Sequence, residues 1–222
     1  MSTWSRTGTA DPDAVAQLPD WLGIVARMAP EVTAEELTRF VPPDGEGRHS
    51  AVLILFSDDR DVLLIQRAST MRKHAGQPAF PGGAVDDTDA DAAAAAVREA
   101  EEETGLDPSG VLVFGSLPDL WVPVTNYVVT PVLAYWKQQS AVWAQDPAEV
   151  ASVHRVPIDD LIDPANRCRV LHPSGFVGPG FDVHGLLVWG FTGGLLSTLL
   201  DRCGWAVPWD EERVVPLSDS LT

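Results

Sequence analysis

Residues 98–106 read Arg98-Glu99-Ala100-Glu101-Glu102-Glu103-Thr104-Gly105-Leu106. They end an alanine-rich run that predicts a helix over 91–104, with Gly105 at the position of a left-handed cap. Residues three and four apart share one face of a helix, so Glu99, Glu102 and Glu103 point the same way. Their carboxylates repel one another and lie at the negative end of the helix dipole. A cation relieves both effects, so the pattern predicts a site for a divalent metal ion with oxygen ligands.

An acidic run on a helix is also compatible with a plain solvated surface, and the three glutamates alone leave that alternative open. Two neighbouring features favour the metal site. Arg98 lies four residues before Glu102, the spacing at which the two side chains pair on a helix. Gly82 and Gly83 precede the helix, and a backbone without a Cβ lets a ligand approach closely.

Gly83 together with residues 98–106 closely resembles the Nudix box, roughly G-x5-E-x7-R-E-U-x-E-E-x-G-U. The last nine positions match in full. Asp89 stands where the pattern has Glu, with one extra residue before Arg98, and we do not count it as a ligand. The resemblance implies Mg²⁺ or Mn²⁺ as cofactor. It implies three metal ligands and a structural arginine as the catalytic set: Glu99, Glu102, Glu103 and Arg98.

Positive charge is concentrated just upstream, where four basic side chains fall within eight residues of a chain that has only 15 Lys plus Arg. A loop with no special role is the alternative. Because this loop runs into the glycines before the helix, we expect its arginines and lysine to contact phosphate oxygens. For the histidine, a phosphate contact or simple packing in the loop is favoured over a role as general base. The predicted substrate-binding residues are Arg67, Arg72, Lys73, His74, Gly82 and Gly83.

The same loop resembles the signature of the coenzyme A pyrophosphatase subfamily of Nudix hydrolases, roughly L-L-T-x-R-S/A-x3-R-x3-G-x3-F-P-G-G. Ile65 replaces the threonine of that signature. The resemblance implies metal-dependent hydrolysis of the diphosphate of coenzyme A or its derivatives to adenosine 3′,5′-bisphosphate and 4′-phosphopantetheine. A carboxylate general base is expected, and the sequence leaves three alternatives open. They are Glu102, Glu103 and an acid on another loop, such as Glu149.

Other functions remain open beside this one. A Nudix hydrolase of ADP-ribose, a dinucleoside polyphosphate or a nucleoside triphosphate would carry the same box. A non-catalytic module that binds a nucleotide and regulates a partner is a second alternative, although such modules usually lose box glutamates. A small acidic structural protein without a ligand is disfavoured by the two linked motifs.

Strand and helix patterns alternate along the 222 residues without a repeat, and 45% of residues are hydrophobic, so an α+β fold with a real core is expected. The family resemblance implies a Nudix-type α/β/α sandwich with a mixed β-sheet between helices. We predict an N-terminal helical extension over 1–47, the Nudix hydrolase domain over 48–204 and a C-terminal tail over 205–222. Expected elements outside the metal helix are helices near 21–28, 33–40 and 191–202 and strands at 51–56, 62–66, 111–116, 127–136 and 150–156.

The net charge of −17 excludes a broad basic surface for nucleic acid. The longest uncharged apolar stretch, 185–200, is shorter than the ~20 residues of a membrane span. Without a signal peptide or cysteine metal spacing, Cys168 and Cys203 are expected as reduced thiols in a cytoplasmic protein. The predicted partner is therefore a small coenzyme A-like nucleotide, with no nucleic acid and no membrane. The sequence does not determine the oligomeric state, and a homodimer stays open.

Overall fold

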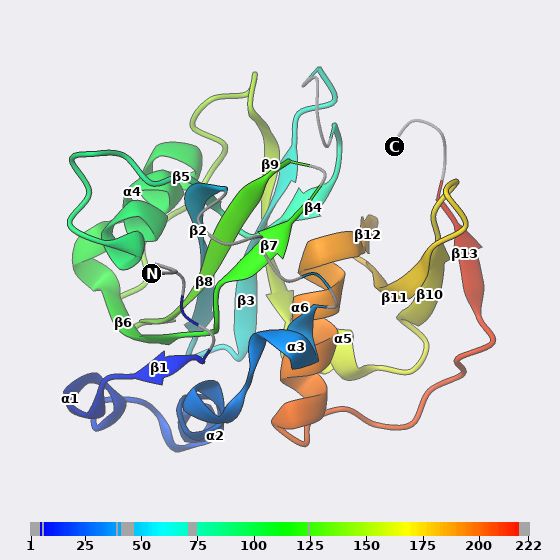
Figure 1. Cartoon of the computed structure of the whole chain (residues 1–222), viewed down its shortest axis with the longest axis horizontal. Coiled ribbons are helices and arrows are strands. Elements are labelled where there is room, and N and C mark those ends of the chain that lie inside the picture. Colours follow the sequence, from blue (N-terminus) through cyan, green and yellow to red (C-terminus); the bar gives the residue numbers. More distant parts are fainter. Residues whose placement is uncertain are drawn as a thin grey trace. The chain divides into compact units, whose positions relative to one another are not determined.

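The computed structural model describes residues 5, 7–38, 40, 47–70, 75–123 and 125–217. The chain divides into two compact units, and each unit is assembled from two separate segments of sequence. The first unit consists of Met1–Asp58 and Pro81–Ala141, and the second of Asp59–Phe80 and Val142–Thr222. Both units contain strands and helices, which confirms the predicted α+β class (Figure 1). The domain boundaries proposed after residues 47 and 204 stay predictions.

Two long buried strands form the centre of the first unit. β2 (Arg48–Ser57) and β8 (Tyr127–Trp136) pair in parallel along their whole length. Side chains on both faces of these strands are buried, as expected where an apolar run lacks alternation. The other strands pair antiparallel, so the sheet is mixed. They are β5 (Gly82–Ala84) on β2, β6 (Val111–Ser116) and β7 (Leu120–Val122) on β8, and β1 (Thr9–Ala10) on β6.

Helix α4 (Ala92–Thr104) packs against β2 and β5 through its alanines (Figure 1). Ala95, Ala96 and Ala100 are fully buried, because only a methyl side chain lets the helix lie close to the sheet. The Asp91 side chain caps the first turn by accepting a 2.8 Å hydrogen bond from the Ala94 amide. Gly105 ends the helix in the left-handed conformation at φ 67°, as predicted. These two caps place the glutamates of residues 98–106 in the last turns.

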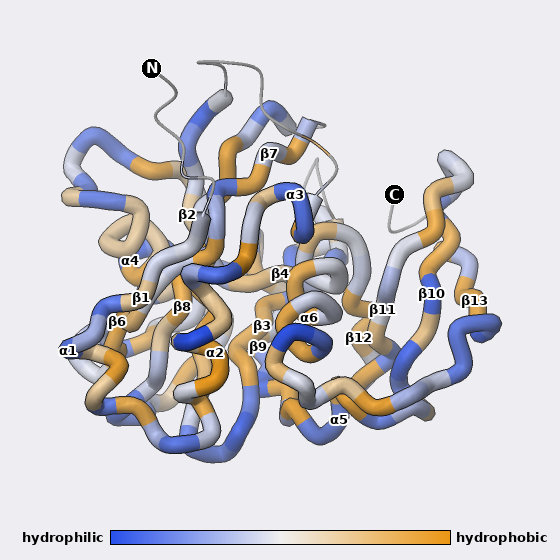
Figure 2. Tube along the Cα trace, turned by 60° about the horizontal axis from the view of Figure 1, so that its bottom comes forward, coloured by the Kyte–Doolittle hydropathy of each residue, from blue (hydrophilic) through white to orange (hydrophobic). Residues whose placement is uncertain are grey.

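Within the first unit, the described N-terminal residues form several short helices. Thr33 and Glu36 form a capping box at the start of the helix predicted near 33–40, but that helix ends at Leu37. Trp21 packs edge-on against Phe56 of β2, with ring centroids 6.2 Å apart. Figure 2 shows hydrophobic residues gathered along α2. The helical segments are α1 (Pro12–Val15), η1 (Asp20–Leu22), α2 (Gly23–Met28), η2 (Ala29–Glu31), α3 (Ala34–Leu37) and, later in the chain, η3 (Pro108–Gly110).

The second unit contains two groups of strands. In the first group, β3 (Asp61–Arg67) pairs antiparallel with β9 (Val150–Pro157) and with β4 (Pro78–Ala79). The second group is a four-stranded sheet, and helix α6 (Gly190–Arg202) packs on its strand β11. Its strands, in spatial order, are β12 (Leu186–Val188), β11 (Val177–Val183), β10 (Arg167–Leu171) and β13 (Val214–Pro216). The short α5 (Ile158–Ile162) follows β9. β13 falls within the segment predicted as a C-terminal tail.

Arg167 is a buried cation in the second unit, with 2% of its surface exposed. Its Cζ lies 4.7 Å from the ring centroid of Phe181 and 4.9 Å from that of Trp209, and Nη2 donates a 3.0 Å hydrogen bond to Ser197. Nε and Nη1 have no hydrogen-bond partner among the residues that the structure describes. Burial lowers the pKa of this guanidinium. The contact with Arg167 holds Trp209 against β10.

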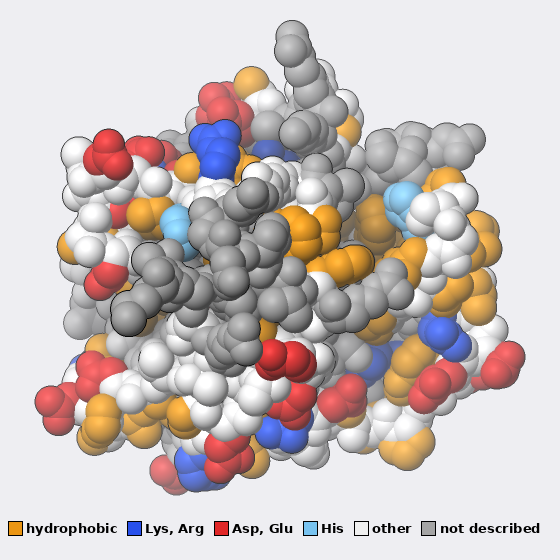
Figure 3. Space-filling model, in the orientation of Figure 1, with side chains coloured by type: hydrophobic (Ala, Val, Ile, Leu, Met, Phe, Trp, Pro, Cys, Tyr) orange, Lys and Arg blue, Asp and Glu red, His pale blue; other side chains and the backbone are white. Residues whose placement is uncertain are grey.

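Within the described ranges, no helix is both long and apolar enough to cross a bilayer. Acidic side chains are scattered over the face drawn in Figure 3, in keeping with the net charge of −17.

Candidate metal and catalytic site

The last turns of α4 carry all three predicted ligands, but in different environments. The side chain of Glu99 is 19% exposed, whereas that of Glu102 is 60% exposed. Glu103 is buried, with 8% of its surface exposed. The helix therefore presents one accessible carboxylate and two that are largely enclosed by the first unit.

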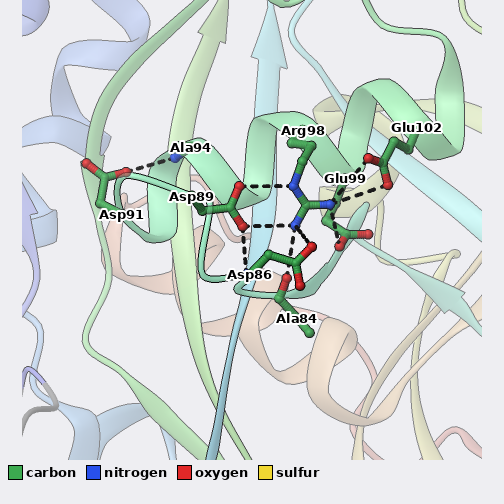
Figure 4. Close-up of polar contacts among 8 residues, drawn as sticks. All are labelled: Ala84, Asp86, Asp89, Asp91, Ala94, Arg98, Glu99 and Glu102. Carbon is green, nitrogen blue, oxygen red and sulfur yellow. Dashed lines mark hydrogen bonds and ion pairs between the residues drawn. The ribbon is translucent and has the colours of Figure 1, made fainter.

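Arg98 connects these carboxylates to the loop before the helix (Figure 4). Its Nη1 donates hydrogen bonds to Glu99 at 2.9 Å and to Glu102 at 3.3 Å. The predicted pairing of Arg98 with Glu102 is thus confirmed. Its Nη2 donates to the carbonyl of Ala84 on β5 at 3.1 Å. One guanidinium therefore fixes the helix, the strand and two carboxylates relative to one another.

Asp89 is the strongest partner of Arg98, and the sequence assigned it no role. It accepts hydrogen bonds from Nε and Nη2 of Arg98, and these contacts raise the pKa of the guanidinium more than any other interaction does. In return, the pKa of Asp89 is lowered, mainly by Arg98 and next by the backbone amide of Asp86. Asp89 is nine residues from Arg98 across a loop, a spacing that carries no periodic signal. The omission of Asp89 from the metal ligands stays a prediction.

The two glycines before the helix lie directly against the carboxylates. The Gly82 amide donates a 3.0 Å hydrogen bond to Oε2 of Glu103. A Cβ at Gly83 would lie 2.4 Å from the Glu99 carboxyl carbon, closer than real Cβ atoms approach any heavy atom. The close approach of a backbone without a Cβ, predicted from the sequence, is made here by the glutamates themselves. Glycine at position 83 leaves room for the Glu99 carboxylate.

Burial raises the pKa of Glu99, and the hydrogen bond from Arg98 opposes that effect only in part. The charge of Glu102 adds to the increase. A largely enclosed carboxylate with another anion nearby is stabilised by a cation, and an oxygen-only donor set suits Mg²⁺ or Mn²⁺. In the described part of the chain, no three His, Cys, Asp or Glu side chains are already arranged around a common metal position. The donor chemistry fits a hard cation, and the exposed Glu102 is the side chain with most freedom to turn toward it.

The predicted phosphate contacts fall partly outside the described residues. Arg72, Lys73 and His74 all lie there. Arg67 ends β3 in the second unit and is partly buried, whereas the glutamates belong to the first unit. Glu149, one of the candidate general bases, is an exposed residue of the second unit whose carbonyl accepts a 2.8 Å hydrogen bond from the Ala68 amide. The roles of these residues stay predictions.

The chain is similar to known proteins over most of its length. The family model for the NUDIX domain matches residues 47–172. An uncharacterized Nudix hydrolase of Escherichia coli K12, NudL, is 38% identical over 197 residues, which cover 84% of this chain and 95% of that protein.

Two solved structures also align with the chain. The Nudix hydrolase RenU of M. smegmatis aligns with a TM-score of 0.47 and 20% identity, over 76% of this chain and all of RenU. A bifunctional NMN adenylyltransferase/ADP ribose pyrophosphatase of Francisella tularensis, complexed with AMP and a Mn ion, aligns with a TM-score of 0.46 and 16% identity, over 75% and 44% of the two chains. The NUDIX model covers more than half of this chain, and its box is carried by α4 and β5, so the chain belongs to the Nudix hydrolase family.

Proposed function

We propose that this protein hydrolyses the diphosphate bond of coenzyme A or one of its derivatives, with Mg²⁺ or Mn²⁺ as cofactor. The observation that carries the metal-dependent chemistry is the packing of Glu99 against Gly83, where Arg98 holds the carboxylate at 2.9 Å. The coenzyme A assignment depends on the basic loop before Gly82 and on its resemblance to the subfamily signature. The proposal places the enzyme in the cytoplasm, where the buried thiols of Cys168 and Cys203 stay reduced.

Glu99, Glu102 and Glu103 would hold the metal. A bound divalent cation neutralises charge on phosphate oxygens and lowers the pKa of water near it. The protein side chains supply the remaining functions. Arg98 positions Glu99 and Glu102, and the Gly82 amide positions Glu103. One carboxylate, from Glu102, Glu103 or Glu149, accepts a proton from the attacking water.

The reaction divides the diphosphate by adding one water molecule. The water oxygen forms a bond to one phosphorus, the bridging P–O bond breaks, and the other phosphate leaves with the bridging oxygen. The products are adenosine 3′,5′-bisphosphate and 4′-phosphopantetheine. Coenzyme A carries a 3′-phosphate besides its diphosphate, and Arg67 and Arg72 would supply the additional cationic contacts.

The test is product analysis by mass spectrometry after the protein is incubated with coenzyme A and Mg²⁺ or Mn²⁺. The proposal expects the two named products in equal amounts and none without metal. A parallel panel contains ADP-ribose, a dinucleoside polyphosphate and a nucleoside triphosphate. Cleavage of a panel member but not of coenzyme A selects the alternative substrate class. Binding of a nucleotide without turnover of any substrate selects the non-catalytic module.

A further inference from the structure

The strand that leads into the basic loop is irregular at its last residue. Gln66 of β3 pairs with Ser152 of β9, but the next residue, Arg67, pairs with Val150. Ala151 is therefore an extra residue on β9, and it forms a β-bulge opposite Arg67. A bulge bends the strand and changes the direction of the side chains beside it. The backbone pairing is thus irregular at Arg67, which is the one predicted phosphate contact of this loop that the structure describes.

A chain of side-chain hydrogen bonds lies beside this bulge. The Ser152 hydroxyl donates to Oε1 of Gln66 at 3.2 Å, and Nε2 of Gln66 donates to the carbonyl of Gly76 at 3.3 Å. Ser152 also lies 2.7 Å from Nε2 of His154. A hydroxyl has one proton to donate, so His154 must donate from Nε2 once Ser152 donates to Gln66. Burial lowers the pKa of His154, which favours the neutral ring.

This series of hydrogen bonds ends at the backbone on either side of Arg67. The Gly76 amide donates to the carbonyl of Arg67 at 3.1 Å, and the Arg67 amide donates to the carbonyl of Gln77 at 3.0 Å. The side chain of Gln66 adds a third connection between the two ends of this segment, through the carbonyl of Gly76. All of these contacts lie within the second unit.

We infer that Gln66, Ser152 and His154 are positioning residues that set the affinity for the phosphates of the substrate by fixing the backbone of Arg67. The inference depends on the proposed function, because it takes Arg67 as a phosphate contact. None of the three residues is a catalytic residue. Their loss should therefore weaken substrate binding while the chemical step on bound substrate continues.

The experiment compares Ser152→Ala and Gln66→Met with Ser152→Thr, which keeps the hydroxyl. The matched control is Ser174→Ala, which removes another serine two residues from a histidine, at 2.8 Å from Nδ1 of His172. The first measurement is hydrogen exchange of the peptide that spans residues 66–77. The second is KM and kcat for coenzyme A. Removing one neutral hydrogen bond should raise KM about five-fold and change kcat by less than about two-fold.

Support requires faster exchange and a higher KM in Ser152→Ala and Gln66→Met, with both values near wild type in Ser152→Thr and Ser174→Ala. Unchanged exchange in Ser152→Ala and Gln66→Met overturns the inference, whatever the substrate is. Faster exchange with an unchanged KM overturns the link to substrate binding. If the wild-type protein cleaves no diphosphate, the proposed function fails, and exchange alone then decides whether the three residues position the segment.

Discussion

Asp89 accepts two hydrogen bonds of 3.0 Å from Arg98, one from Nε and one from Nη2. This pairing anchors the guanidinium independently of the glutamates. Nη1 remains for Glu99 and Glu102, and it contacts both. The loop before α4 thereby determines where the arginine, and through it the two carboxylates, can lie.

Replacing Asp89 with Asn removes this anchor, and we expect a lower kcat and a lower free energy of unfolding near neutral pH. The pKa of Asp89 is lowered from 3.8, so its ionised form stabilises the folded state above that pH. This contribution is lost as the pH falls below about 4 and the carboxylate becomes protonated in the folded state as well. Urea unfolding at pH 6 and pH 3 measures the effect. The difference between wild type and Asp89→Asn should shrink at pH 3, and an equal difference at both pH values would contradict the role given to this carboxylate.

The Gly83→Ala variant should displace the Glu99 carboxylate, because the new Cβ would lie 2.4 Å from it. A misplacement of about 1 Å can cost roughly 100-fold in rate, and we expect a loss of that order in kcat together with weaker Mn²⁺ binding in electron paramagnetic resonance titrations. Gly194→Ala is the control, since a Cβ there meets nothing within 4 Å. It should leave kcat unchanged and raise the free energy of unfolding by about 1 kcal/mol, because it sits inside α6. Normal Mn²⁺ binding by Gly83→Ala would refute the steric argument.

Replacing Glu102 or Glu103 with Gln keeps the side-chain shape and removes the charge. If these residues bind metal or act as base, kcat should fall by about 100-fold or more. Glu101→Gln is the matched control, because Glu101 is an exposed residue of the same turn. Steady-state kinetics and circular dichroism should show lost turnover with an intact fold for Glu102→Gln and Glu103→Gln. Both turnover and fold should be unchanged in Glu101→Gln. Near-normal turnover in Glu102→Gln and Glu103→Gln would count against their ligand role.

Arg72→Ala tests the substrate class. If Arg72 contacts the 3′-phosphate, its loss should raise KM for coenzyme A more than KM for a dinucleotide that lacks this phosphate. Both KM values are measured with the same preparation of the variant, so any partial misfolding affects the two equally. Equal increases for the two substrates would show that Arg72 does not recognise the 3′-phosphate.

Arg167→Met should leave the free energy of unfolding unchanged or raise it by about 1 kcal/mol. The substitution gives up two cation–π contacts and one hydrogen bond, but it also removes a buried charge. Arg167→Ala should instead lower the value by about 2–4 kcal/mol, because it leaves a cavity between Phe181 and Trp209. Urea unfolding of the wild type and the two variants measures the order of their free energies of unfolding. A methionine variant as unstable as the alanine variant would show that the guanidinium itself is required.

Local patterns in the sequence were sufficient to predict the helix that carries the three glutamates. The helix predicted over 91–104 is observed as Ala92–Thr104, because its caps and its glutamate spacing depend only on near neighbours. The pairing of Arg98 with Glu102 followed from the same rule. Which side chains of one helical face are buried depends on the packing of β5, which no local pattern predicts.

Long-range features were missed for one common reason. The contact between Asp89 and Arg98 spans a loop, and the stacking of Arg167 on Trp209 joins residues 42 positions apart. Neither contact leaves a periodic signal along the chain. The two compact units are each assembled from distant segments, so their composition depends on strand pairing rather than on any marker between domains.

The parallel pairing of β13 with β10 limits how far the chain can be shortened. Arg169 and Leu217 both use backbone groups in this pairing, with hydrogen bonds of 2.8 and 2.9 Å. A protein ending at residue 204 would lose this outer strand, expose the amides of β10 and uncover Arg167 where Trp209 had lain. Uncovered strand edges join to one another, so such a truncated protein should self-associate at concentrations where the full chain does not.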